Sequence, residues 1–494
     1  MAGLILYSVN PRSLGTLPEW TAAVLEAEKL GCNAIHVNPF HPVTAEGKEI
    51  KGRKFTGSLY ALRDHFTINK EFCGGANQAT AWYQLRDFIK LAHAKYMRIM
   101  ADLPLHHLAV DHPLVASHPE FFKRNPDGSL HMPGPADNPW SEAAAIDYHN
   151  PNAWNYFLGE GGYWLRLMDQ YLELGFNAFR CDLVYWLPQL VWEQVLNYAH
   201  RREPEILVLA EALGLSGQDA ELMQETLRES DARIVYDICY DDVGREWGAR
   251  DISALKSGRA GRLDQAAHYG TMGFVDAHDF TPRAAELRAQ LGTGEEADQK
   301  IAARCIRDYA VACFTNPSVM LQRGYQWCVE DNIGTYREQV SAEFFKSLKH
   351  ERKIAPSPLT ISAAIVEMHR LRAQIPPQIS VEFSRLHMPE YKNLTAMQCD
   401  FYPIGSEQII ASIILLLNTT PEEGPQKFPE SWWLDFKGQQ SNAQRWQFGP
   451  DRKMREQISS VAVLMVPGGI TVNRQLNPSH KAALNPAAEA TLVA

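Results

Sequence analysis

Eight short apolar segments, separated mainly by helical patterns, constrain the fold of this chain more than any other feature. The predicted strands span residues 3–9, 32–39, 96–107, 176–182, 205–214, 232–240, 271–279 and 318–324. Amphipathic stretches between them, such as 79–95, 161–174 and 187–202, predict helices. This alternation implies parallel strands with right-handed crossovers, and eight such units fit a closed barrel better than an open sheet. The expected fold class is α/β, a (β/α)8 TIM barrel.

The length of 494 residues exceeds one ordinary core, so further domains are expected. We assign the barrel to 1–107 and 161–375. The connection 108–160 after the third strand is rich in Pro, Asp, His and Asn and predicts a small inserted domain over the barrel mouth. Strand patterns broken by turn residues predict a C-terminal all-β domain over 378–476, and 477–494 reads as a disordered tail.

Charge and cysteine usage limit the partners. A net charge of −10 and a pI near 6.0 argue against nucleic acid or an anionic membrane surface as a partner. No apolar stretch is long enough to span a membrane, and the N-terminus reads as a first strand, not as a signal peptide. Eight scattered cysteines without a Cys-x-x-Cys pair favour a reduced, cytoplasmic compartment. The oligomeric state stays open.

Charged residues stand at the predicted strand ends. Asp102 lies late in the third strand, Asp182 ends the fourth, Glu211 lies near the end of the fifth and Asp279 ends the seventh. In a (β/α)8 barrel these ends face the active site, so the four carboxylates should converge there. Each alone could form a structural ion pair, but four at equivalent positions favour a functional site. Arg180, His107 and His278 are expected among them.

Several carboxylates around one cleft suit glycoside hydrolysis, in which one carboxylate attacks the anomeric carbon and a protonated one assists the leaving oxygen. A neighbouring arginine and carboxylate would separate the two pKa values. A hydrolytic metal site is the rival interpretation, suggested by His106 and His107. Neighbours on a strand point to opposite faces, so this pair should not chelate together, and no metal is expected.

Four segments in order resemble the α-amylase superfamily of glycoside hydrolases, over about residues 3–375. They are "DLPLHH" (102–107), "GFNAFRCD" (175–182), "LAEALG" (209–214) and "FVDAHD" (274–279). Each is a weak match alone, and the ordered set is strong. The segment "GSLYALRDHFTIN" (57–69) is similar to the one whose tyrosine, here Tyr60, stacks under the sugar.

The resemblance implies roles for these positions. Asp182 would be the nucleophile, Glu211 the general acid/base and Asp279 the stabiliser that grips sugar hydroxyls. The substrate-binding set would be Tyr60, Asp102, His107, Arg180 and His278, with Arg180 beside the nucleophile to keep it ionised and the two histidines bonded to sugar hydroxyls.

Departures from the family pattern concern calcium and the acceptor. His106 replaces an asparagine that helps bind a structural calcium in many relatives, which makes calcium doubtful, and no cofactor is expected. "LVYW" after Asp182 replaces a lysine–histidine pair that touches the next sugar, and 111–129 resembles the branch of maltosyltransferases that use maltose 1-phosphate. The basic segment 48–55 reads as a solvated loop or, alternatively, as a phosphate contact.

The sequence therefore predicts a retaining α-glycoside hydrolase that acts on α-1,4-glucans or malto-oligosaccharides through a covalent glycosyl-enzyme. The alternative is a maltosyl- or glucanotransferase, with maltose 1-phosphate as a candidate donor. A relative that kept the fold and binds carbohydrate without catalysis is a third hypothesis, which the intact nucleophile and acid positions disfavour.

Overall fold

A computed structural model describes most of the chain up to residue 375 and the strands beyond it. The described ranges are 3–214 without 51, 136 and 137, then 238–240, 270–354, 359–375, 379–386, 393–403, 408–419, 426–427, 429, 444–448, 457–458 and 461–467. The predicted helix near 217–229 and the predicted tail 477–494 lie outside these ranges.

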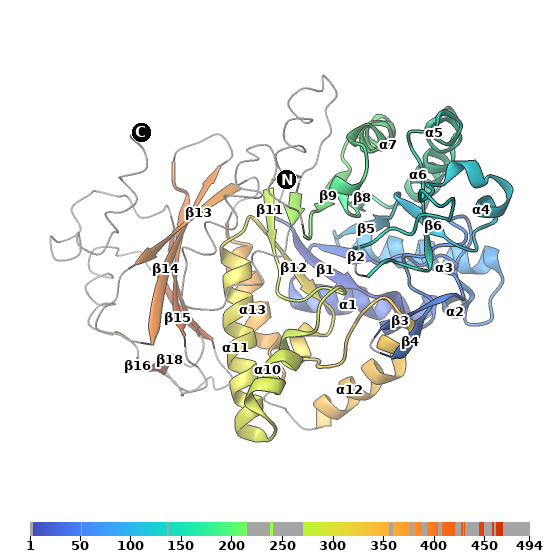
Figure 1. Cartoon of the computed structure of the whole chain (residues 1–494). Coiled ribbons are helices and arrows are strands. Elements are labelled where there is room, and N and C mark those ends of the chain that lie inside the picture. Colours follow the sequence, from blue (N-terminus) through green and yellow to red (C-terminus); the bar gives the residue numbers. More distant parts are fainter. Residues whose placement is uncertain are drawn as a thin grey trace.

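Eight parallel strands close into a barrel (Figure 1), which confirms the TIM-barrel prediction. The strands are β1 (Ile5–Val9), β2 (Ala34–Val37), β5 (Arg98–Leu103), β8 (Ala178–Cys181), β9 (Leu207–Glu211), β10 (Ile238–Tyr240), β11 (Gly270–Gly273) and β12 (Ser318–Gln322). Each pairs with the next along the chain, and β1 pairs with β12 to close the ring.

Alternation along the strands divides the barrel into two packed layers. On β8, Ala178 faces the barrel interior together with Leu6, Met100 and Leu209 of other barrel strands. Cys181 belongs to the outer core, between the strands and the helices. Because successive side chains on a strand point to opposite faces, Arg180 and Asp182 share the inner face with Ala178.

Helices surround the barrel. The long ones are α1 (Thr21–Leu30), α3 (Gln78–Ala94), α6 (Tyr163–Leu174), α7 (Gln189–Arg202), α11 (Glu295–Phe314), α12 (Ala342–Ile354) and α13 (Ser362–Arg372). Among them, α3, α6 and α7 match the stretches predicted at 79–95, 161–174 and 187–202. The helix α10 (Arg283–Leu291) follows the seventh strand. Gly31 and Gly175 end α1 and α6 in the left-handed region, at φ 75° and 104°, which turns the chain toward β2 and β8.

Two small antiparallel pairs add to the mouth of the barrel. The strand β6 (His107–Ala109), at the start of the 108–160 segment, pairs with β7 (Ala143–Ala145) inside it. The same segment contains the short helices α4 (Pro113–Ser117) and α5 (Pro151–Leu158). The basic segment predicted as a loop instead forms a hairpin of β3 (Gly47–Ile50) and β4 (Arg53–Thr56). Gly52, at φ 75°, supplies its turn.

A five-stranded antiparallel sheet follows the barrel. Its order is β13 (Ile379–Leu386), β14 (Leu394–Pro403), β15 (Ala411–Asn418), β19 (Val461–Pro467) and β17 (Gln444–Phe448), and the short β16 (Gln426–Lys427) pairs with β18 (Gln457–Ile458). The helix α11 stands between this sheet and the barrel (Figure 1). From α11, Arg307 Nη1 donates to the backbone oxygens of Asn418 and Thr419 at 3.3 Å each. Helix and sheet thus share one apolar core.

Two sequence expectations concern membrane-spanning segments and the cysteines. Within the described ranges, no helix combines the length and apolar character that crossing a bilayer requires. The seven cysteines whose side chains are described are free and buried.

Candidate active site

A cavity of about 510 Å³ opens at the carboxyl ends of the barrel strands. Its lining contains seven of the eight predicted site residues, namely Tyr60, His107, Arg180, Asp182, Glu211, His278 and Asp279. The eighth, Asp102, lies directly behind them and is 3% exposed. The structure therefore brings together the whole predicted set.

Arg180 is the centre of the site. Its Nη1 donates to Asp182 Oδ1 at 2.6 Å and to Asp102 Oδ1 at 2.9 Å, and its Nη2 lies 3.6 Å from Glu211 Oε2. Arg180 is only 1% exposed, so these contacts are shielded from water. One guanidinium is thus divided among three carboxylates, and the site carries more negative than positive groups.

Asp102 receives the fullest set of partners. Besides Arg180, the Tyr60 hydroxyl donates to its Oδ2 at 2.6 Å, and His36 Nε2 lies 3.1 Å from the same oxygen. Burial alone would raise the pKa of Asp102, but Arg180, His36 and Tyr60 outweigh it and the pKa falls below its usual range. Asp102 is therefore the permanent counter-charge of Arg180.

Asp182 behaves differently from the sequence expectation that Arg180 simply keeps it ionised. Burial raises the pKa of Asp182 well above its usual range, and the carboxylates of Asp102 and Glu211 add to this rise. Arg180 lowers the pKa but does not outweigh burial and the two neighbouring carboxylates. The carboxylate cluster therefore tends to retain a proton.

Glu211 is held by two backbone N–H groups. Leu183 N donates to Oε2 at 2.7 Å, and Leu213 N donates to Oε1 at 2.9 Å. Leu183 adopts a left-handed conformation, at φ 44°, in the sharp turn after Asp182, a strained geometry for a non-glycine residue. Burial raises the pKa of Glu211 to about 7 despite the opposing charge of Arg180, as a group that delivers a proton near neutral pH requires.

Asp279 lies farther from its strand than predicted. The seventh strand ends at Gly273, six residues earlier (279 − 273), so the prediction that Asp279 ends this strand is wrong. Any Cβ at Gly273 would lie 2.2 Å from Ala312 O, so only glycine fits against α11 where the chain leaves the sheet. The Asp279 side chain is 44% exposed, with Oδ2 at 3.1 Å from His278 Nε2. It therefore stands at the rim of the cavity.

Tyr60 and the predicted histidines form one wall. The Tyr60 and His278 rings stack at 5.2 Å between centroids, with 15° between their planes. Asn38 Nδ2 donates to the Tyr60 hydroxyl at 3.0 Å, and His107 Nε2 lies 3.0 Å from Tyr60 O. Burial lowers the pKa of His107 to about 4, so the ring is neutral at pH 7 and can both donate and accept hydrogen bonds.

The sequence argument that His106 and His107 point to opposite faces of a strand is wrong. The strand β5 ends at Leu103, so the rule of opposite faces does not apply, and the His106 and His107 rings pack with centroids 4.2 Å apart. His106 Nδ1 lies 3.7 Å from Asp182 Oδ2. In the part of the chain that the structure describes, no group of three His, Cys, Asp or Glu side chains is arranged to hold a metal.

Sequence reasoning missed several polar residues of the site. His36 supports Asp102, and Glu142 and Tyr336 line the cavity. Lys48 lines it too, and its segment 48–55 was considered only as a possible phosphate contact. His36 could have been found, because it and Asn38 alternate with apolar residues in the second strand and so face the barrel interior. Glu142 and Tyr336 lie outside the barrel strands, where no periodic pattern indicates them.

A closed (β/α)8 barrel with buried carboxylates around one arginine resembles the α-amylase-like proteins. A family model described as "Glycogen debranching enzyme, glucanotransferase domain" matches residues 1–129. An α-amylase from Lactobacillus plantarum has the same fold, with a TM-score of 0.60 and 17% identity, over 94% of this chain and 98% of that one.

Two curated relatives are named alpha-1,4-glucan:maltose-1-phosphate maltosyltransferase. The protein from Picrophilus torridus is 25% identical over 222 residues, which are 42% of this chain and 32% of the relative. The protein from Bifidobacterium longum is 24% identical over 397 residues, 78% of this chain and 46% of the relative. The chain thus matches less than half the length of these relatives. These matches confirm the resemblance to the α-amylase superfamily near its maltosyltransferases, and to α-amylase-like glycoside hydrolases and transglycosidases.

Proposed function

We propose that this chain is a retaining transglycosidase that transfers maltosyl or longer α-1,4-glucanosyl units to an α-1,4-glucan or malto-oligosaccharide. The observation that carries the choice of transfer over hydrolysis is the agreement between the glucanotransferase family model and the maltosyltransferase relatives. Hydrolysis, the main expectation from the sequence, is the second candidate and is favoured only by the α-amylase fold neighbours.

The proposed chemistry assigns one role to each carboxylate. Asp182 attacks the anomeric carbon while Glu211 gives its proton to the departing oxygen, which leaves a glycosyl ester on Asp182. Glu211 then takes the proton of an acceptor hydroxyl, whose oxygen attacks the same carbon and frees Asp182. The pKa of Glu211 near 7 suits this exchange of roles. Asp279, at the rim, would bind hydroxyls of the donor sugar.

The remaining residues would position the sugar. Tyr60 offers an aromatic face beside His278, and His107 and His278 offer neutral ring nitrogens to sugar hydroxyls. Asp102 would act mainly through Arg180 and Tyr60, because its oxygens are already occupied. Arg180 would balance the charge that moves between Asp182 and Glu211 during the reaction.

The domain division is part of the same proposal. We assign the catalytic barrel to 1–107 and 161–375, the inserted domain to 108–160 and a β domain to 378–476. The pairing of β6 with β7 and the five-stranded antiparallel sheet support this division. We further propose that no cofactor takes part and that the protein is cytoplasmic.

Product analysis tests the proposal directly. Maltoheptaose is incubated alone, with inorganic phosphate and with maltose 1-phosphate, and the products are separated by chromatography. Longer and shorter glucans together indicate glucanosyl transfer, and growth by two units with release of phosphate indicates maltosyl transfer. Glucose and maltose as the only products would overturn transfer in favour of hydrolysis. The Asp182→Ala variant serves as the inactive control.

A further inference from the structure

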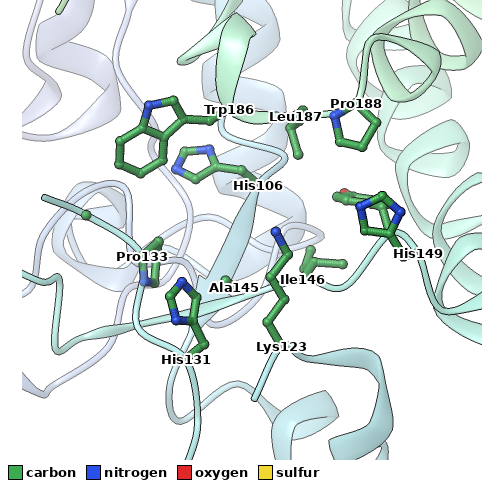
Figure 2. A pocket seen from close by; sticks show the side chains of 12 residues that line it. His106, Lys123, His131, Pro133, Ala145, Ile146, His149, Trp186, Leu187 and Pro188 are labelled. Atoms are coloured by element: carbon green, nitrogen blue, oxygen red, sulfur yellow. The ribbon is translucent and has the colours of Figure 1, made fainter. Parts of the chain in front are cut away.

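A second cavity, of about 180 Å³, lies beside the active site (Figure 2). Its walls come from the loop after β5, from the 108–160 segment and from the chain around the short helix η4 (Val184–Trp186). Four of its described lining residues carry nitrogen groups that can be cationic, namely His106, Lys123, His131 and His149. No carboxylate is found among the described residues that line it.

An aromatic pair separates this cavity from the barrel mouth. Trp140 lines the mouth and Trp186 lines the second cavity, and their rings stack at 5.2 Å with 16° between planes. The His106 ring lies 5.8 Å from each of them. The two cavities therefore have different linings, and His106 lies between the second cavity and Asp182.

His106 is a polar group without a partner at this wall. The residue is 4% exposed, and neither of its ring nitrogens makes a hydrogen bond with the described residues. A buried donor or acceptor left in this condition costs about 1–3 kcal/mol. The charged and titratable groups that face His106 are Asp182, Asp102, Arg180, His107 and Lys123. A ligand that supplies an acceptor here would remove the cost.

We propose that this cavity binds a small oxyanion of the phosphate or sulfate class. Lys123 provides the charge, and His106 donates a ring N–H to the anion, a charge-assisted pair of the kind that oxyanions favour. On binding, His106 takes up a proton. Its Nδ1 then carries a proton that faces the Asp182 carboxylate, 3.7 Å away. Its other ring nitrogen donates a hydrogen bond to the anion. Both ring nitrogens are then satisfied, and the anion is linked to Asp182 through one ring.

Calorimetry with inorganic phosphate at pH 6.5 tests the site. We expect saturable binding that weakens about tenfold or more in Lys123→Met, the effect of losing one charge-assisted contact. The exposed Lys90 of α3 provides a matched control, and Lys90→Met should bind phosphate as the wild type does. Lys48→Met removes a cation that lines the barrel mouth instead and should leave this binding unchanged within about twofold.

Proton uptake gives a second readout. The heat of binding should vary with the ionisation enthalpy of the buffer, and this variation should shrink in His106→Asn. Free phosphate and sulfate are compared with glucose 6-phosphate, because a phosphate ester is the other source of the same group. Tighter binding of the ester identifies it as the ligand, and equal or weaker binding identifies the free anion. Absence of saturable binding by all three compounds, binding unaffected by Lys123→Met, or loss in Lys48→Met instead would overturn the proposal.

Discussion

Arg180 Nη1 lies 2.6 Å from Asp182 Oδ1, yet Asp182 is not the only carboxylate that this nitrogen contacts. The same nitrogen donates to Asp102 at 2.9 Å, and Asp102 has His36 and Tyr60 as further partners. Two aspartates on one arginine therefore play different parts. Asp102 holds Arg180 in place. The pKa of Asp182, in contrast, can change when a sugar binds beside it.

The first prediction concerns Asp182. Asp182→Ala should lower turnover by about four orders of magnitude or more, because the group that attacks the anomeric carbon is absent. The melting temperature should stay near that of the wild type, since the folded protein gains little from ionising a carboxyl with a raised pKa. Initial rates and thermal melts measure both effects. A slow fluorinated glycosyl substrate should label Asp182, and a label found on another residue by peptide mapping would refute the role.

Cys181 is the matched control for this experiment. Its side chain points into the outer core and is fully buried, with no part in the cavity lining. Cys181→Ala should lower stability by about 1 kcal/mol through lost packing and leave turnover nearly unchanged.

The second prediction compares the two aspartates. Asp102→Asn should destabilise the protein by about 3 kcal/mol at pH 7, because it weakens a buried ion pair and a set of hydrogen bonds. Asp182→Asn should cost much less. The pKa of Asp102 is depressed on folding, so its stabilising contribution is present above its ordinary value of 3.8 and is lost as the pH falls below that. Denaturant unfolding of both variants at pH 7 measures the difference, and equal losses would contradict the assignment.

The third prediction concerns the proton on Glu211. With malto-oligosaccharides, activity should fall as the pH rises through about 7, where Glu211 loses its proton. Glu211→Gln should abolish this limb and be nearly inactive on such donors. It should still react with α-maltosyl fluoride, whose leaving group needs no proton. The pH–rate profiles of both proteins on both donors provide the measurement, and an unchanged profile in an active variant would exclude Glu211.

A further prediction concerns Glu211 and the pH dependence of stability. Its folded-state pKa of about 7 exceeds the ordinary value of 4.5, so its contribution to stability is complete below pH 4.5 and is lost as the pH rises to 7. Relative to Glu211→Gln, the wild type should therefore lose up to about 3 kcal/mol of stability over this window. Chemical unfolding at intervals between pH 4 and 8 tests the trend. A constant difference between the two proteins would contradict it.

The last prediction concerns calcium. We expect no change in melting temperature on adding a chelator or calcium, because His106 and Lys123 present nitrogen groups where a cation would need oxygen ligands. A fall of several degrees with the chelator would show a bound ion that stabilises the folded state by mass action.

The sequence predicted much of this molecule, for identifiable reasons. Side chains alternate between the two faces of a strand, which predicted that Arg180 and Asp182 share the inner face. The alternation of eight strands with helices predicted the barrel. The position of Asp279 was missed, since the chain leaves β11 at Gly273 for a packing reason that lies in α11. The raised pKa of Asp182 was missed because it depends first on burial and then on the neighbouring carboxylates Asp102 and Glu211, which are properties of the assembled site.

The helix α11 packs against both the barrel and the five-stranded sheet. Its residues pack toward β11 and β12 on one side and toward β15 and β19 on the other, and Arg307 bonds the chain at Asn418 and Thr419. A shortened protein that ended at residue 375 would keep every barrel strand and the whole carboxylate cluster. It would also expose to water the face of α11 that β15 now covers, and Arg307 would lose its bonds to Asn418 and Thr419. Excision of the barrel as an independent catalyst would therefore need a redesigned outer face on this one helix.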